Sequence, residues 1–334
     1  MKILIVYTKR NEFVKTDIDL LNSTHDVREL KVSYNGLESV RSVKEIISGV
    51  QWADVIFSWF GGPHALLPFM LARLIRRPRI VVASGFDVAN LPEIQYGNMR
   101  PGFRRSIGIL VFHLAQKILA VSDYTAGELK RNIPVNPNKI ERVYHGFSIK
   151  NSSCASIKPR DQALTIGVVK ENNLLRKGIL TYVNAAKYLP EVRFSMVGPW
   201  VDNSIHELQV ISPPNVQFTG FVQDLSSIFP LSKAYVQCSY HEAFGCSVAE
   251  AMLYGCVPVV SDRGALPEVV GETGFYVPVD DPRAVAEGIR LALESDEEWG
   301  CRARQRIVDL FPLEERARRL NEVLDEVYIE RSGL

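Results

Sequence analysis

Two glutamates, Glu242 and Glu250, lie on either side of an expected helix start. The apolar run 233–238 before them predicts a buried strand, and the run 247–254 predicts a helix. The first backbone N–H groups of a helix have no partners within it and lie at its positive end, where a phosphate can bind. Two carboxylates that accept hydrogen bonds from sugar hydroxyls would flank this anion site. The combination suits a nucleotide sugar.

The elements that must position these residues follow one pattern in both halves of the chain. Short continuous apolar runs alternate with helical patterns, which is typical of parallel sheets covered on both faces. We therefore expect an α/β protein with two doubly wound, Rossmann-like domains whose parallel sheets face each other across a cleft. The expected boundaries are an N-terminal domain over 1–150, a linker over 151–163, a second domain over 164–311 and a C-terminal helix over 312–334. This last helix could cross back to the first domain.

The composition fits two ordinary globular domains. The 334 residues are 46% apolar and 23% charged, and the length is sufficient for two cores. The five cysteines are odd in number and lack C-x-x-C spacing. We therefore expect neither a disulfide framework nor a zinc site, and we predict a cytoplasmic protein.

The net charge of +1 hides a basic first half and an acidic second half. Much of the basic excess consists of two arginine groups, Arg73, Arg76, Arg77 and Arg79, then Arg100, Arg104 and Arg105. The favoured interpretation of the apolar stretch 107–115 is a buried helix with a solvated basic lead-in. The alternative is a face that docks on anionic lipid at the inner side of the membrane, or holds a phosphate-bearing acceptor. Because aromatic residues do not alternate with the basic ones, no nucleic-acid partner is expected.

The motif around the two glutamates resembles the signature of the retaining nucleotide-sugar glycosyltransferases of family 4, which have the two-domain GT-B fold. It comprises 241–245, 250–252 and 255–260, within a resemblance that is strongest over 164–280 and weaker from 54 to 150. The resemblance implies that Glu242 binds the donor sugar and Glu250 binds the ribose. It also implies that the sugar and the distal phosphate are held by the segment Ala243, Phe244, Gly245, Cys246 and Ser247.

A second segment, 167–178, resembles the phosphate clamp of the same family. The resemblance assigns Lys177 to the clamp, and either Lys170 or Arg176 to its other cation. Such cations would stabilise the charge that builds on the departing diphosphate without a metal ion. Gly198 and Val222 are expected at the same rim, near the base of the donor.

The acceptor side departs from the family pattern. Relatives carry a Gly-Gly loop after the first strand and a His after the fourth; residues 7–13 contain no glycine, and 82–87 contain no histidine. Ser84 and Gly85 would let a substrate approach closely, and Asp87 could bind an acceptor hydroxyl. His64 is either a second acceptor-side residue or a histidine near a helix cap.

The resemblance implies a retaining, metal-independent hexosyltransferase that uses a UDP-, GDP- or ADP-sugar and a carbohydrate or lipid-linked acceptor. No cofactor is expected. The D-x-D pattern of Asp17 and Asp19 is interpreted as part of a surface helix, not as a metal site. Two alternatives remain: a nucleotide-sugar 2-epimerase on the same fold, and a degenerate donor-binding partner without catalysis.

Overall fold

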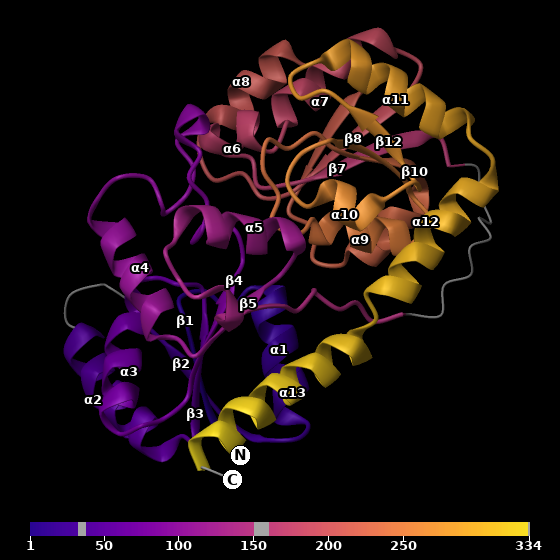
Figure 1. Cartoon of the computed structure of the whole chain (residues 1–334). Helices are drawn as coiled ribbons and strands as arrows, with labels where there is room; N and C mark the ends of the chain where they lie inside the picture. The colour runs from indigo at the N-terminus through magenta and orange to yellow at the C-terminus, as the bar shows by residue number, and fades with distance from the viewer. Residues whose placement is uncertain (33–37, 150–159, 333–334) are drawn as a thin grey trace. The chain divides into compact units, whose positions relative to one another are not determined.

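The computed structural model describes residues 1–32, 38–149 and 160–332. The chain divides into two compact units, the first formed by Met1–Gly146 with Leu313–Leu334 and the second by Phe147–Pro312 (Figure 1). Each unit contains a six-stranded sheet in which all the paired strands are parallel.

The first unit has the strand order β2-β1-β3-β4-β5-β6. Its strands are β1 (Lys2–Tyr7), β2 (Asp26–Lys31), β3 (Val55–Trp59), β4 (Arg79–Ala83), β5 (Lys117–Ala120) and β6 (Ile140–Arg142). Its helices are α1 (Glu12–Asn22), α2 (Glu38–Trp52), α3 (Pro63–Leu74), α4 (Phe103–Leu114), α5 (Asp123–Asn132) and α13 (Leu313–Ser332), with short 3-10 turns at Pro92–Ile94 and Pro137–Lys139.

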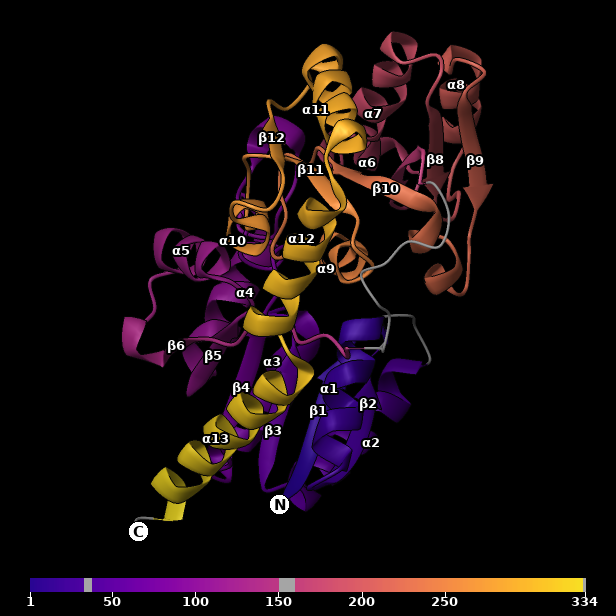
Figure 2. The same ribbon diagram turned by 90° about the vertical axis from the view of Figure 1, so that its right-hand side faces the viewer.

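Both faces of the first sheet are covered, which explains its continuous apolar strands. Every residue of β3 is buried, as are all of β1 except Lys2. Helices α2, α3, α4 and α5 share one hydrophobic core with the sheet, whereas α1 packs with α13. Helix α13 runs beside α1 along this unit (Figure 1 and Figure 2).

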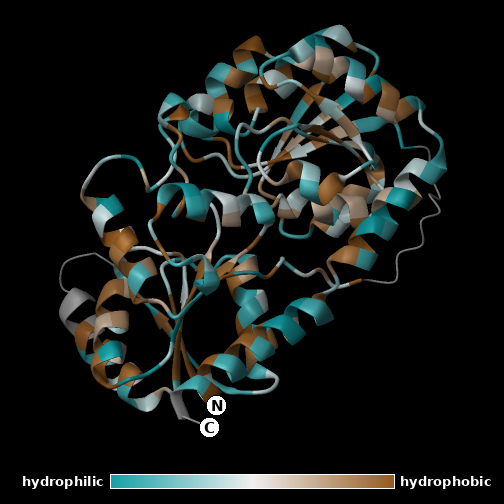
Figure 3. Ribbon diagram, viewed as in Figure 1, coloured by the Kyte–Doolittle hydropathy of each residue, from teal (hydrophilic) through white to brown (hydrophobic). Residues whose placement is uncertain are grey.

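The second unit has the strand order β12-β11-β10-β7-β8-β9. Its strands are β7 (Gln162–Ile166), β8 (Arg193–Val197), β9 (Val216–Gly220), β10 (Ser232–Gln237), β11 (Val257–Ser261) and β12 (Phe275–Val277). Its helices are α6 (Glu171–Arg176), α7 (Ile179–Ala185), α8 (Ser204–Ile211), α9 (Cys246–Leu253), α10 (Leu266–Val270), α11 (Pro282–Glu294) and α12 (Glu297–Leu310), with 3-10 turns at Ala186–Tyr188, Leu225–Ser227 and Phe229–Leu231. Its strands carry brown, hydrophobic residues among paler and teal ones in Figure 3.

The prediction of two doubly wound, Rossmann-like domains is confirmed, because each strand order reverses within a parallel sheet. Most of the expected linker, residues 151–159, lies outside the described residues. Within the described part of the chain, no helix combines the length and the apolar character needed to cross a bilayer.

The cysteines correct one expectation. Cys238, Cys246 and Cys256 are free thiols, but Cys301 is disulfide-bonded. An odd number of cysteines leaves room for a pair, so the count did not exclude a disulfide. The cytoplasmic location, which relied on that expectation, stays a prediction.

Candidate functional site

The loop between β10 and α9 places Glu242 at the carboxyl end of the second sheet. β10 ends at Gln237, and α9 begins at Cys246 with Gly245 as its N-cap. Gly245 has a φ of 100°, which favours glycine, and a Cβ there would lie 2.9 Å from Cδ2 of Leu266. No side chain of the cap residue occupies the helix N-terminus. This end of α9 therefore has the geometry of an anion site.

The Glu242 carboxylate is held by two side-chain donors. Lys177 Nζ and Ser239 Oγ both donate to its Oε1, the latter at 2.9 Å. Ser239 in turn accepts a hydrogen bond from Nε2 of Gln237 at 2.7 Å. The Glu242 side chain is 11% exposed, so the carboxylate is oriented by protein groups while part of it still reaches solvent.

The backbone of Glu242 is fixed as well. Its carbonyl oxygen accepts a hydrogen bond from the amide of Ala265 at 2.9 Å. Gly264, with a φ of 62°, packs directly against the Glu242 backbone, where a Cβ would overlap it. Two loops therefore clamp the glutamate, and its position does not depend on the Lys177 contact alone.

Electrostatics keep Glu242 ionised. Burial raises the pKa of this carboxyl, but the charge and hydrogen bond of Lys177, then the charge of Arg176 and the hydrogen bond of Ser239, outweigh burial and lower the pKa below its ordinary value of 4.5. At neutral pH the group is therefore a carboxylate that can accept hydrogen bonds from hydroxyls.

A glycine brings Lys177 to Glu242. Gly178, the N-cap of α7, has a φ of 67°, and a Cβ there would overlap the carbonyl oxygen of Cys238 at the end of β10. The Tyr240 amide also donates to the carbonyl oxygen of Arg176 at 2.9 Å. Since β7 and β10 are neighbouring strands, their following loops meet at one edge of the sheet.

The two candidates for the other cation of the clamp, Arg176 and Lys170, act on different carboxylates. Arg176 acts electrostatically on Glu242 and donates to Oδ1 of Asn173 at 2.7 Å. Hydrogen bonds from Ser204 and from the Glu171 amide are the main causes that lower the pKa of Asp202. The charge of the exposed Lys170 adds a smaller effect in the same direction. Lys170 and Lys177 are the N-cap and the C-cap of helix α6.

Glu250 and Ser247 lie in α9, both half-buried. Burial raises the pKa of the Tyr235 hydroxyl, which hydrogen-bonds Ser247 and experiences the charges of both Glu242 and Glu250. Tyr235 thus lies near both predicted ligands. The sequence-based prediction assigned no role to Tyr235, Gln237 or Ser239. The sequence signal that could have pointed to them is that each carries a polar group in, or just after, an otherwise apolar strand.

The remaining donor-side residues take backbone or packing positions. Gly198 follows β8 with a φ of 147°, and a Cβ there would overlap the carbonyl of Gly167. Its amide donates to the carbonyl oxygen of Gly220 at 2.9 Å. Val222 follows β9 and is half-buried. The buried ring of Phe244 packs on Phe311. Ala243 and Cys246, half-buried, flank Phe244 and Gly245 in the same loop.

The expected acceptor-side residues lie in the first unit, around the ends of β3 and β4. Both carboxylate oxygens of Asp87 accept backbone hydrogen bonds, Oδ2 from Gly61 at 2.9 Å and Oδ1 from Ser84 at 3.1 Å. Gly85, with a φ of 112°, is buried in the same turn. Asp87 is 3% exposed, and burial raises its pKa to about 6. This carboxylate therefore braces two loops.

His64 is buried in the first turn of α3, where its Nε2 lies 2.7 Å from the carbonyl oxygen of Trp59. Burial lowers the pKa of the imidazole. The ring is thus oriented by the backbone of β3.

Asp17 corrects another expectation. The helix predicted around Asp17 and Asp19 is present as α1, but Asp17 is fully buried and pairs with Arg316 of α13 at 2.6 Å. The sequence could not show this partner because it lies almost at the other end of the chain. Among the described residues, no group of three or more His, Cys, Asp or Glu is placed to hold a metal ion.

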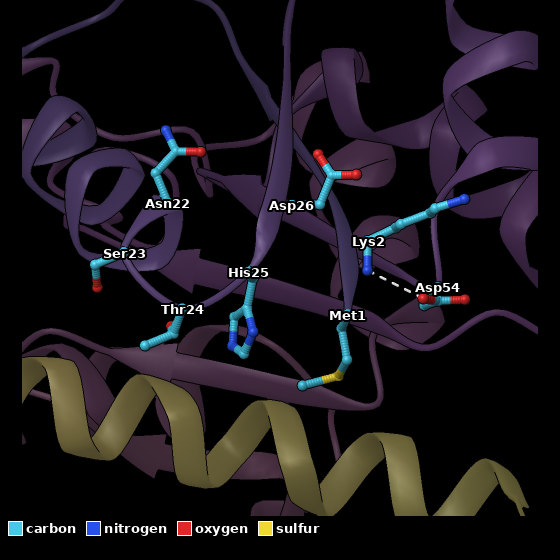
Figure 4. Close-up of a pocket in the computed structure, with 8 residues that line it drawn as sticks. All are labelled: Met1, Lys2, Asn22, Ser23, Thr24, His25, Asp26 and Asp54. Atoms are coloured by element: carbon cyan, nitrogen blue, oxygen red, sulfur yellow. Dashed lines mark hydrogen bonds between the residues drawn. The ribbon is translucent and has the colours of Figure 1, made fainter.

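A shallow cavity of about 500 Å³ lies elsewhere in the first unit, at the amino ends of β1 and β3 (Figure 4). Its lining comprises Met1, Lys2, Asn22, Ser23, Thr24, His25, Asp26 and Asp54. None of the predicted site residues contributes to it. The Lys2 amide donates to Asp54 at 3.0 Å, and we assign this cavity no part in the donor site.

Residues 161–295 match the family model Glyco_trans_1_4, described as "Glycosyl transferases group 1". The O-antigen chain mannosyltransferase B of Escherichia coli is 25% identical over 206 residues, which are 54% of this chain and 52% of that protein. This chain therefore spans about half the length of the curated relative it matches.

Solved structures share the whole fold at low identity. Anabaena Alr3699/HepE in complex with UDP-glucose has a TM-score of 0.76 and 17% identity, covering 98% of this chain and 100% of that one. Sucrose-phosphate synthase from Thermosynechococcus elongatus has a TM-score of 0.76 and 17% identity, covering 99% and 100%. These neighbours show the two-domain GT-B fold. The segment that matches the group 1 glycosyltransferase model, 161–295, contains the loop that carries Glu242.

Proposed function

We propose that the protein is a retaining, metal-independent glycosyltransferase that moves a hexose from a nucleotide diphosphate sugar to an acceptor hydroxyl. The observation that carries this proposal is the ionised Glu242, held by Lys177 close to the N-terminus of α9, whose N-cap residue is Gly245. These groups lie at one edge of the sheet. The carboxylate suits the sugar hydroxyls of such a donor, and the cation and the anion site suit its diphosphate.

Each group has a distinct role in the proposed reaction. Glu242 accepts hydrogen bonds from the sugar hydroxyls, and Glu250 binds the ribose. The bond from the anomeric carbon to the diphosphate breaks while a bond to the acceptor oxygen forms on the same face, and the acceptor proton passes to the leaving phosphate. Lys177 has three donors, so it can contact a phosphate oxygen while it still orients Glu242. With Arg176, it would stabilise the negative charge that develops on the diphosphate.

The comparisons suggest which donors to test first. The E. coli relative is named as a mannosyltransferase, and the Anabaena neighbour holds UDP-glucose. We therefore propose UDP-, GDP- or ADP-linked hexoses, beginning with mannosyl and glucosyl donors, and a carbohydrate or lipid-linked acceptor.

The test is a transfer assay with these donors, with and without EDTA, followed by NMR of the product's anomeric configuration. We expect transfer with retained configuration, unaffected by EDTA. Glu242→Gln and Lys177→Ala should abolish it while the circular dichroism spectrum stays native. Full activity in either variant would refute the site.

Two other results would replace the proposal. A donor incubated alone that returns an epimerised sugar would indicate a 2-epimerase. Calorimetric binding of a nucleotide sugar without turnover on any acceptor would indicate a non-catalytic donor-binding protein.

A further inference from the structure

Two neighbouring helices of the first unit, α3 and α4, expose large apolar side chains. Five residues form what we call the apolar helix face: Leu67, Met70 and Leu74 of α3, with Phe103 and Leu110 of α4. The most exposed are Leu74, at 78%, and Phe103, at 80%. α2, which packs on the other side of α3, adds the exposed Val43 and Ile47.

This exposure is not a by-product of core packing. Leu67, Met70 and Leu74 are spaced i, i+3 and i+7, which places them on one stripe of α3. The opposite stripe, with Phe69 and Ala72, is fully buried in the core. Helix α3 is therefore apolar on both sides, although one side would suffice to hold it on the sheet. Figure 3 shows brown, hydrophobic residues along both α3 and α4.

Positive charge lies at both ends of the apolar helix face. Arg73 and Arg76 are exposed where α3 ends, and Arg104 and Arg105 are exposed where α4 begins. None of these four forms an ion pair within the described part of the chain.

Negative charge is almost absent from this region. The only acidic residues between 63 and 115 are Asp87 and Glu93. Asp87 is buried and accepts backbone hydrogen bonds, so it does not offset the surface arginines. A partner that complements the positive charge of this face is therefore anionic.

We propose that the apolar helix face and its four arginines dock the protein on an anionic lipid bilayer. The leucines, methionine and phenylalanine would enter the boundary between headgroups and acyl chains, while the arginines contact lipid phosphates. This extends the sequence-based alternative for the Arg100–Ala115 region, because α3 contributes the larger part of the face. It does not depend on the proposed sugar transfer.

The test is flotation of the full chain with two kinds of vesicle, phosphatidylcholine alone and phosphatidylcholine mixed with phosphatidylglycerol. We expect the protein to float with the mixed vesicles, with a bound fraction that falls as salt is added. The double variant Leu74→Glu/Phe103→Glu should lose flotation. Arg73→Gln/Arg104→Gln should weaken it about tenfold or more on the mixed vesicles.

Val210→Glu is the matched control. Val210 is 86% exposed on α8 of the second unit, so this variant makes one such apolar-to-glutamate substitution, with half the added charge of the double variant, outside the proposed face. It should float like the wild type. Circular dichroism should be unchanged in every variant.

Three results would overturn the proposal. One is no flotation with the mixed vesicles at low salt, and another is wild-type flotation of Leu74→Glu/Phe103→Glu. The third is a soluble oligomer that the same double variant dissociates without any vesicle binding, which would make this face a protein interface.

Discussion

Lys177 and Glu242 form an ion pair that joins the loops following two neighbouring strands, β7 and β10. The pair is partly exposed, at 24% for Lys177 and 11% for Glu242, so a ligand can reach both groups. Ser239 orients the same carboxylate, and Gly178 allows the lysine loop to approach the end of β10. The contact therefore depends on the packing of two segments more than 60 residues apart.

The first prediction separates the two lysines of the expected clamp. Lys177→Met should lower transfer by about a hundredfold or more, because a cation next to the developing diphosphate charge is lost. Lys170→Met should change it by less than about threefold, because Lys170 is exposed and lies near Asp202. Donor affinity by calorimetry and initial rates provide the measurement. Equal losses in both variants would contradict this assignment.

The second prediction concerns the glycine that brings Lys177 into place. In Gly178→Ala the alanine would have to adopt a φ of 67°, and its Cβ would overlap the carbonyl oxygen of Cys238. Gly220 has a φ of 71°, but a methyl group at its Cα would meet nothing within 4 Å, so Gly220→Ala introduces the backbone strain alone. We expect the free energy of unfolding to fall by about 1 kcal/mol for Gly220→Ala and clearly further for Gly178→Ala.

Urea denaturation of both glycine variants checks this. The difference between them isolates the steric overlap, since their φ values are nearly the same. Indistinguishable midpoints would show that the chain around Cys238 relaxes freely.

The third prediction follows from the buried carboxyl of Asp87. Burial raises its pKa to about 6 from an ordinary value of 3.8, so the folded state binds the proton more tightly than the unfolded state. The stability contributed by this proton is present below about pH 4 and is lost as the pH rises through about 6. The difference between a pKa of 3.8 and one of about 6 corresponds to about 3 kcal/mol in the free energy of unfolding.

Urea denaturation of the wild type and of Asp87→Asn, from about pH 4 to pH 7, measures this loss. The difference in free energy of unfolding between wild type and variant should fall by about 3 kcal/mol over the range, because asparagine does not titrate. A constant difference would mean that Asp87 keeps an ordinary pKa.

The fourth prediction concerns the buried pair of Arg316 and Asp17, whose side chains are 2% and 0% exposed. Arg316 also donates to the carbonyl oxygens of Val143 and Tyr144. Arg316→Met leaves a buried, unpaired carboxylate and should lower the free energy of unfolding by about 3–5 kcal/mol. Arg318, paired with Glu315 and Glu322 on the exposed side of α13, is the matched control, and Arg318→Met should cost less than about 1 kcal/mol.

Thermal or urea unfolding measures both arginine variants. The double variant Asp17→Asn/Arg316→Met should lose less free energy of unfolding than the two single variants lose together. The reason is that each single substitution leaves one buried charge unpaired, whereas the double substitution leaves none. A small effect of Arg316→Met would mean that the pair does not hold α13 on the first unit.

Local sequence was sufficient for the elements and for the place of each residue along them. Continuous apolar runs predicted the parallel strands, because both faces of each sheet are covered. The helix start at Cys246 and the position of Glu242 in the loop before it also followed from the sequence, since strand, glycine and helix signals are contiguous there.

Only the tertiary structure decided which distant residues meet. The sequence allowed either Lys170 or Arg176 in the first clamp position, and the fold brings the charge of Arg176 to bear on Glu242 and that of Lys170 on Asp202. The sequence placed Asp17 on a surface, and α13 buries it under Arg316. The physical reason is the same in both cases: spacing along the chain determines which face of an element a side chain occupies, whereas strand order and helix packing determine what lies against that face.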